Sequence, residues 1–101
     1  MIKHIVSWRH QEGFTPQEQT EHAERIKQEL LAVADAVSGV ISLEVRSDLL
    51  STSNQDLILD ATFVSEDSLL KYQKHPQHVK AGEFIRSVMT NRTCCDYQTE
   101  D

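Results

Sequence analysis

The chain has 101 residues and a mass of 11.5 kDa, which fits one ordinary domain and leaves no room for a second. Hydrophobic residues make up 39% of the chain and charged residues 26%, a balance that is typical of globular domains and argues against a disordered chain. The formal net charge of -6, with no cluster of basic residues, argues against nucleic acid as a partner.

The first half of the chain predicts a strand, a long helix and a second strand. Residues 2–8 alternate between two faces and are rich in β-branched side chains, which is typical of a strand. The sequence Thr-Pro-Gln-Glu at residues 15–18 combines an N-cap, a proline at the first helical position and a capping-box glutamate. Apolar residues then recur at helical spacing towards Gly39, which suits a left-handed helix end. Residues 40–46 alternate again and predict the second strand.

The second half of the chain predicts a strand, two short helical stretches and a final strand. Residues 56–63 show the clearest alternation of apolar and polar side chains in the sequence. A serine and two acidic residues at 65–67 predict the start of a short helix, which ends at residues 75–76 because the residue before a proline avoids helical geometry. A further helical stretch spans about residues 79–89, and the fourth strand spans residues 93–97.

This order of elements is that of an α+β ferredoxin-like βαββαβ domain, in which a four-stranded antiparallel sheet carries its helices on one face. We place the domain at residues 1–98 and a polar tail at residues 99–101. The arrangement leaves the other face of the sheet bare. That face is either solvated or covered by a second copy of the chain, and the alternation of residues does not decide between the two.

Three stretches of the sequence resemble the stress-responsive dimeric A/B barrel (Dabb) family. They are Ile-Lys-His-Ile-Val at residues 2–6, Val-Ile-Ser-Leu-Glu-Val at residues 40–45 and Tyr-Gln-Lys-His-Pro-Gln-His-Val at residues 72–79. The resemblance implies a homodimer in which two protomers pack their bare sheet faces together into a closed barrel. The residues that we expect at this interface are Glu44, Arg46, Asp56, Ile58 and Asp60.

The resemblance also implies candidate catalytic residues, because some members of the family are polyketide cyclases that use neither cofactor nor metal. In these enzymes a histidine matching His78 is the base, a tyrosine matching Tyr72 is hydrogen-bonded to it, and a histidine matching His4 lines the same pocket. A further pocket tyrosine of the cyclases matches Ile26 here, so the chain departs from their pattern. A histidine with an ordinary pKa near 6.5 accepts a proton readily at neutral pH, which suits removal of an acidic proton next to a carbonyl.

Each of these residues also has a purely structural interpretation. Tyr72 and His78 can satisfy each other around a turn, and His4 can be a core histidine with a polar partner. The apolar wall of a pocket would come from residues that can equally be plain core, namely Val6, Trp8, Ile26, Leu57, Leu59, Phe63, Ala81 and Phe84. The His-x-x-His spacing of His75 and His78 could bind a metal with His4 or His22 as a third donor, but no cysteine or carboxylate is placed to complete the set, so we expect no metal and no cofactor.

The function that we expect is that of a homodimeric stress-response A/B barrel domain with a small apolar pocket for an aromatic or polyketide-like molecule. The alternative is a cofactor-independent polyketide cyclase or lyase with His78 as general base. Oxidation of an aromatic or haem substrate is a third possibility, for which the sequence has no distinguishing motif.

The remaining features concern location and thiol chemistry. The longest aliphatic run is the five residues 30–34, far below the ~20 needed to span a bilayer, and residues 1–5 lack the apolar core of a signal peptide. We therefore expect no membrane association and a cytoplasmic location. Cys94 and Cys95 are adjacent, and a bridge between neighbours is strained, so we expect reduced thiols of which at least one is buried.

Overall fold

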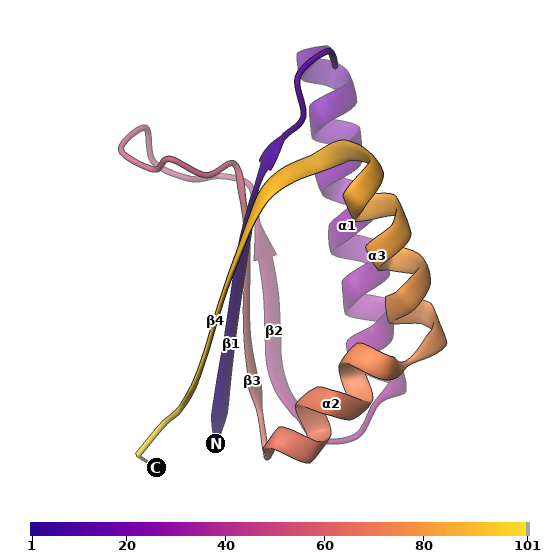
Figure 1. The fold of residues 1–101 in the computed structure, drawn as a ribbon, viewed down its shortest axis with the longest axis vertical. Coiled ribbons are helices and arrows are strands. Elements are labelled where there is room, and N and C mark those ends of the chain that lie inside the picture. The colour runs from indigo at the N-terminus through magenta and orange to yellow at the C-terminus, as the bar shows by residue number, and fades with distance from the viewer. Residues whose placement is uncertain (101) are drawn as a thin grey trace.

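Four strands and three helices follow one another in the computed structural model, which describes residues 1–100. In chain order they are β1 (Ile2–His10), α1 (Pro16–Ala36), β2 (Val40–Arg46), β3 (Leu57–Phe63), α2 (Glu66–Lys74), α3 (Pro76–Val88) and β4 (Met89–Gln98). All three helices lie on one side of the sheet (Figure 1), so the predicted ferredoxin-like α+β fold is confirmed.

The sheet has the strand order β2-β3-β1-β4, and all neighbouring strands are antiparallel. The even-numbered residues of β1 from Ile2 to Trp8 and the odd-numbered residues of β3 point toward the helices and are buried. They pack against the apolar faces of the helices, where Ile26, Val33 and Tyr72 are fully shielded from solvent. The alternation seen in the sequence therefore identifies the core face of both central strands.

Helix α1 begins as predicted. The Thr15 side chain accepts a hydrogen bond from the Glu18 backbone N–H at 3.1 Å, and the Glu18 carboxylate accepts one from the Thr15 backbone N–H at 2.9 Å. The helix ends at Ala36, ahead of Gly39, which adopts a φ of +87° in the following turn. None of the helices within residues 1–100 combines the length and the hydrophobicity that a membrane span requires.

The break between α2 and α3 is shorter than predicted. We expected the last helix to begin near residue 79, but it begins at Pro76, immediately after His75. His75 has a non-helical backbone with ψ at 135°, and its Nδ1 accepts a hydrogen bond from the Gln77 backbone N–H at 3.1 Å. Because proline suits the first position of a helix, one histidine ends α2 and caps α3. This compact joint fixes the spacing between Tyr72 on α2 and His78 on α3.

The last strand, β4, begins at Met89, four residues before the predicted start at residue 93. It is an edge strand, and every side chain that follows Met89 in it is exposed or half-exposed within this protomer. Cys94 and Cys95 are both free thiols and both exposed, so the prediction that at least one of them is buried is wrong. The physical reason differs between the two thiols. Cys94 projects to the helix side, but the helices cover the β4 edge less completely than the centre of the sheet, whereas Cys95 projects to the face without helices.

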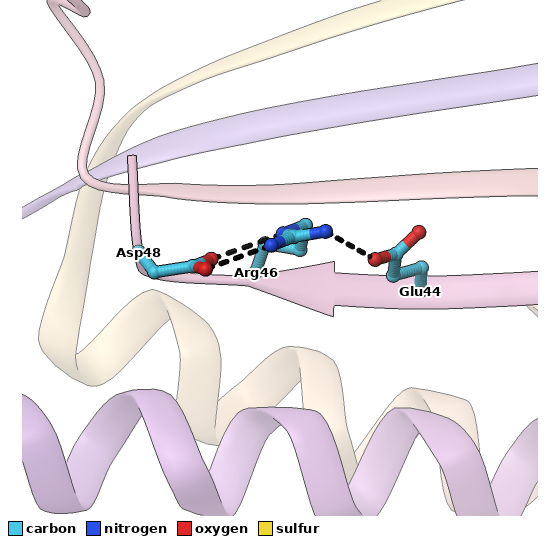
Figure 2. Close-up of polar contacts among 3 residues, drawn as sticks. All are labelled: Glu44, Arg46 and Asp48. Atoms are coloured by element: carbon cyan, nitrogen blue, oxygen red, sulfur yellow. Dashed lines mark hydrogen bonds and ion pairs between the residues drawn. The ribbon is translucent and has the colours of Figure 1, made fainter. Parts of the chain in front are cut away.

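The face of the sheet that points away from the helices carries most of the charges expected at a dimer interface. On β2, the Arg46 guanidinium contacts the Asp48 carboxylate at 2.7 Å and the Glu44 carboxylate at 2.9 Å (Figure 2). Both carboxylates raise the pKa of Arg46, and Asp48 has the larger effect. Arg46 and Glu44 are thus paired within one chain, and Asp48, which the sequence did not single out, completes the cluster.

The carboxylates of Asp60 in β3 and of Asp56 just before it also have partners in the same chain. The Lys3 ammonium donates to the Asp60 carboxylate at 2.6 Å, and this hydrogen bond raises the pKa of Lys3. Asp56 accepts a hydrogen bond from the His10 backbone N–H at 2.9 Å. Ile58 lies among these groups and is half-buried in the single protomer. The face therefore presents paired charges around a small apolar centre.

Candidate functional site

A cavity of about 340 Å³ lies between the sheet and the helices. All three helices and the strands β1, β3 and β4 contribute to its lining. The residues are His4, Val6, Trp8, Leu30, Leu59, Tyr72, His78, Gly82, Ile85, Arg86, Met89, Thr90, Asn91 and Arg92. The three predicted catalytic residues, His4, Tyr72 and His78, thus line one cavity although they come from three different elements.

Tyr72 is the most deeply placed of the three, with no part of the residue exposed. Its ring makes edge contacts with His78, at 4.7 Å between ring centroids, and with Phe63, at 5.2 Å. Its hydroxyl has no hydrogen-bond partner among residues 1–100, and burial raises its pKa, so it remains a protonated donor at neutral pH. The hydrogen bond from Tyr72 to His78 that the resemblance implied is therefore absent, because the two rings meet edge to face.

His78 is half-buried at the first turn of α3. Burial lowers its pKa, and the nearby imidazole of His4 and guanidinium of Arg92 lower it further. The ring is therefore neutral at pH 7 and can accept a proton from a molecule in the cavity. Its aromatic contact with Tyr72 fixes the position of the ring without occupying a ring nitrogen.

His4 is nearly fully buried, with 3% of its surface exposed, and its polar partner lies on β4. Its Nδ1 contacts the Asp96 carboxylate, and Asp96 stands directly opposite His4 in the β1–β4 register. The Cys94 sulfur lies 4.0 Å from the same nitrogen. The pKa of the Cys94 thiol is raised, mainly by burial and to a smaller extent by the charge of Asp96. Neither partner could be predicted from the sequence, because local patterns do not specify the register between the first and last strands.

A β-bulge shapes the β4 side of the cavity. The register between β1 and β4 shifts between Ser7 and Arg9, and Asn91 has a φ of +53°, which non-glycine residues rarely adopt. The Gln55 side chain donates a hydrogen bond to the Asn91 carbonyl at 3.1 Å and so supports this geometry. The extra residue brings Asn91 and Arg92 together at the cavity, and neither could be found from local sequence alternation.

The structure divides the predicted apolar wall into two groups. Val6, Trp8 and Leu59 line the cavity. Four further residues lie in the hydrophobic core away from the cavity lining, namely Ile26, Leu57, Phe63 and Ala81. Phe84 also lies elsewhere, half-buried at the α1–α3 contact, where the Arg25 guanidinium sits 3.7 Å above its ring. From α3, the cavity is lined by Gly82, Ile85 and Arg86 in place of the predicted Ala81 and Phe84.

The sequence profile of the Stress responsive A/B Barrel Domain (Dabb) matches residues 2–99. The chain belongs to this family. No curated protein matches the sequence, so the comparison gives this Dabb domain a family and no established activity.

Solved structures show the same fold. A dimeric protein of unknown function from Bacteroides fragilis is 24% identical with a TM-score of 0.87, and the match covers 97% of this Dabb domain and 95% of that chain. A dimeric ferredoxin-like protein of unknown function from Thermobifida fusca is 25% identical with a TM-score of 0.81, covering 97% and 90%. A hydroxynitrile lyase from Passiflora edulis is 13% identical with a TM-score of 0.78, covering 99% and 94%.

Proposed function

We propose that this Dabb domain is a homodimer that binds a small aromatic or polyketide-like molecule in the cavity of each protomer. The observation that carries the proposal is the Tyr72 hydroxyl, a buried donor without a partner in the described chain, on a residue that lines the cavity. An unpaired buried donor costs about 1–3 kcal/mol, so an acceptor group on a bound molecule would remove a real penalty.

The rest of the cavity fits such a molecule. Its volume of about 340 Å³ is at the lower end of the range for small-molecule sites, so the ligand is small. Val6, Trp8, Leu30 and Leu59 supply apolar surface to one part of the lining. A molecule with an apolar ring and a carbonyl or hydroxyl oxygen would match both the apolar wall and the Tyr72 donor.

The dimer is supported by a different part of the molecule. The sheet face opposite the helices is uncovered in one protomer (Figure 1), and Ile58 lies among its paired charges. The structures from Bacteroides fragilis and Thermobifida fusca are both described as dimeric. A second copy of the same face would bury Ile58, and the charges around it already have partners within their own chain.

Ligand binding can be tested with the protein's own fluorescence, because Trp8 is the only tryptophan in the chain and lines the cavity. We expect a hydroxynaphthalene to change Trp8 fluorescence in a saturable way. Gly82→Leu should abolish the change by filling the cavity from α3, whereas Lys80→Leu, at an exposed position of the same helix, should leave it intact. A Trp8 signal that does not saturate across a panel of such aromatics, or that Gly82→Leu leaves unchanged, contradicts the proposal.

A second candidate function, a cofactor-independent cyclase or lyase, is favoured by the lowered pKa of His78 beside the Tyr72 donor. In this reaction neutral His78 takes a proton from the carbon between two carbonyls. The enolate carbon then attacks another carbonyl carbon of the same molecule, and the imidazolium returns its proton to the new alkoxide. Tyr72 would donate a hydrogen bond to the oxygen on which negative charge develops.

The enzyme hypothesis is tested by incubating the protein with a poly-β-ketone and following the ring product by absorbance. Wild type should form product, and His78→Gln should lose at least about a hundredfold in rate, the lower range for general base catalysis. Equal rates for wild type and His78→Gln would exclude this chemistry and leave the binding proposal standing.

A further inference from the structure

We propose a binding site for a zinc-type divalent cation formed by His4, Cys94 and Asp96. This inference goes beyond the proposed binding of an organic molecule and does not depend on it. It concerns the edge of the sheet, where β1 and β4 pair beside the cavity.

The strand register brings the three side chains together. His4 stands opposite Asp96, and its neighbour on the same face, Val6, stands opposite Cys94. Since alternate residues of a strand share a face, Cys94 and Asp96 project to the same side of β4 as His4 does on β1. Cys95 falls between them and projects to the opposite face of the sheet.

The distances among the three donor atoms are close to those around a metal ion. The Cys94 sulfur lies 4.0 Å from His4 Nδ1 and 3.6 Å from Asp96 Oδ1. All three donor atoms lie within 4.8 Å of one another. Ligand atoms bonded to one tetrahedral zinc ion are about 3.3–3.7 Å apart, given bonds of ~2.0 Å to nitrogen or oxygen and ~2.3 Å to sulfur.

One contact must change on binding. His4 Nδ1 and the Asp96 carboxylate now touch each other directly, and an ion between them requires their separation to increase to about 3.3 Å. The Asp96 side chain is 39% exposed on an edge strand, so it has room to rotate outward. The His4 ring, in contrast, is held by edge contacts with Phe63 and Tyr72 and offers a fixed ligand.

The donor set indicates which ion fits. One imidazole nitrogen, one thiolate sulfur and one carboxylate oxygen suit zinc or cobalt, whereas magnesium and calcium prefer oxygen ligands alone. Three protein ligands leave a fourth tetrahedral position for water. Because His4 also lines the cavity, an ion bound to its Nδ1 would lie at the cavity's edge.

The proposed site differs from the prediction made from the sequence. We expected no metal because no cysteine or carboxylate was placed to complete a set of His75 and His78 with His4 or His22. The proposed site uses His4 alone of these histidines, together with Cys94 and Asp96 from the opposite end of the chain. The three groups project to the helix side of the sheet, so a dimer formed through the other face would leave them accessible. The competing interpretation is a plain His4–Asp96 ion pair with Cys94 as a bystander.

The test is a titration of the full-length protein with Co²⁺, whose bond to a thiolate gives a charge-transfer absorption band. Wild type should bind one equivalent with this band, and Cys95→Ser should behave like wild type. Cys94→Ser should lose the band, and Asp96→Asn should weaken binding by about tenfold or more. The absence of the band in wild type, or its persistence in Cys94→Ser, overturns the proposal.

A second measurement needs no variant and therefore does not depend on variants folding. Wild-type protein is alkylated with iodoacetamide in Zn²⁺, in Mg²⁺ or in a chelator, and mass spectrometry assigns the modified cysteine. Zn²⁺ should slow modification of Cys94 at least tenfold and leave Cys95 unaffected, and Mg²⁺ should protect neither. Protection of Cys95 or of neither thiol by Zn²⁺ overturns the proposal. The Trp8 titration is done in the chelator, so failure of one proposal is distinguishable from failure of the other.

Discussion

The substitution Tyr72→Phe removes a single buried oxygen from a residue that lines the cavity and should have opposite effects on stability and on binding. The ring remains, so the edge contacts with Phe63 at 5.2 Å and His78 at 4.7 Å between centroids are kept. Only the hydroxyl disappears, and it has no partner within residues 1–100. The variant therefore isolates the energetic effect of one buried, unpaired donor.

The size of the effect follows from the cost of such a donor. An unsatisfied buried polar group costs about 1–3 kcal/mol, so the ligand-free variant should be more stable than wild type by about that amount. For a domain of this length, 1 kcal/mol corresponds to about 4–8 °C in the midpoint of thermal unfolding. Binding of a hydroxynaphthalene should weaken by about twofold to tenfold, because a hydrogen bond contributes about 0.5–1.5 kcal/mol.

Thermal unfolding followed by circular dichroism, at one fixed protein concentration, measures the first effect, and Trp8 fluorescence measures the second. Tyr97→Phe is the matched control, since Tyr97 is 49% exposed on β4 and should shift stability by no more than about 0.5 kcal/mol. A Tyr72→Phe variant that is less stable than wild type by about 1 kcal/mol would refute the reasoning. It would mean that the hydroxyl is already paired in the free protein, by water for example.

Three further predictions concern α3, the sheet face and pH. Gly82→Ala should raise stability by about 0.5–1 kcal/mol in thermal unfolding, because alanine favours the helix and the added methyl would meet only the mobile end of Arg86 at 3.2 Å; a lower midpoint contradicts this. Ile58→Arg should give a monomer in sedimentation at micromolar concentration, whereas Leu70→Arg, exposed on α2, should not; unchanged association would place the interface elsewhere. Acidification below about pH 6.5 should destabilise wild type more than His78→Gln. The pKa of His78 is lowered in the folded protein, so the unfolded chain binds a proton there at a higher pH than the folded chain does. Free energies of unfolding that fall in parallel with pH for the two proteins would exclude this.

Most of the fold could be predicted from the sequence because most of the elements bury only one face. One-sided burial produces a regular spacing of apolar residues along the chain. Residues 2–8 and 56–63 alternate and form the two central strands, and the capping box at residues 15–18 sets the start of α1. The start of β4 was missed for a physical reason. The bulge at Asn91 lies near the start of this strand and breaks the alternation, and the side chains of β4 lie at an exposed edge where no burial pattern is required.

The residues of the candidate site also fall into those that could be predicted from the sequence and those that could not. Tyr72 and His78 could be singled out because they lie in one short segment, and the joint at Pro76 brings them into ring contact. Asp96, Cys94 and Arg92 could not, because their proximity to His4 and His78 depends on β4 returning beside β1 across more than 80 residues of chain. Strand order and register, which local patterns do not specify, decide which polar groups meet at the cavity.

The contact between His4 and Asp96 determines what His4 offers to a molecule in the cavity. A carboxylate only accepts hydrogen bonds, so an Asp96 carboxylate in contact with Nδ1 selects the ring form that carries its hydrogen there. In a neutral ring, Nε2 is then an acceptor, while Tyr72 supplies a donor and His78 a proton acceptor. A metal ion on Nδ1 would leave Nε2 protonated and turn the same ring into a donor. Occupancy of the proposed metal site would therefore change which oxygen or nitrogen groups the cavity accepts, and comparing ligand binding in Zn²⁺ and in chelator would measure that change directly.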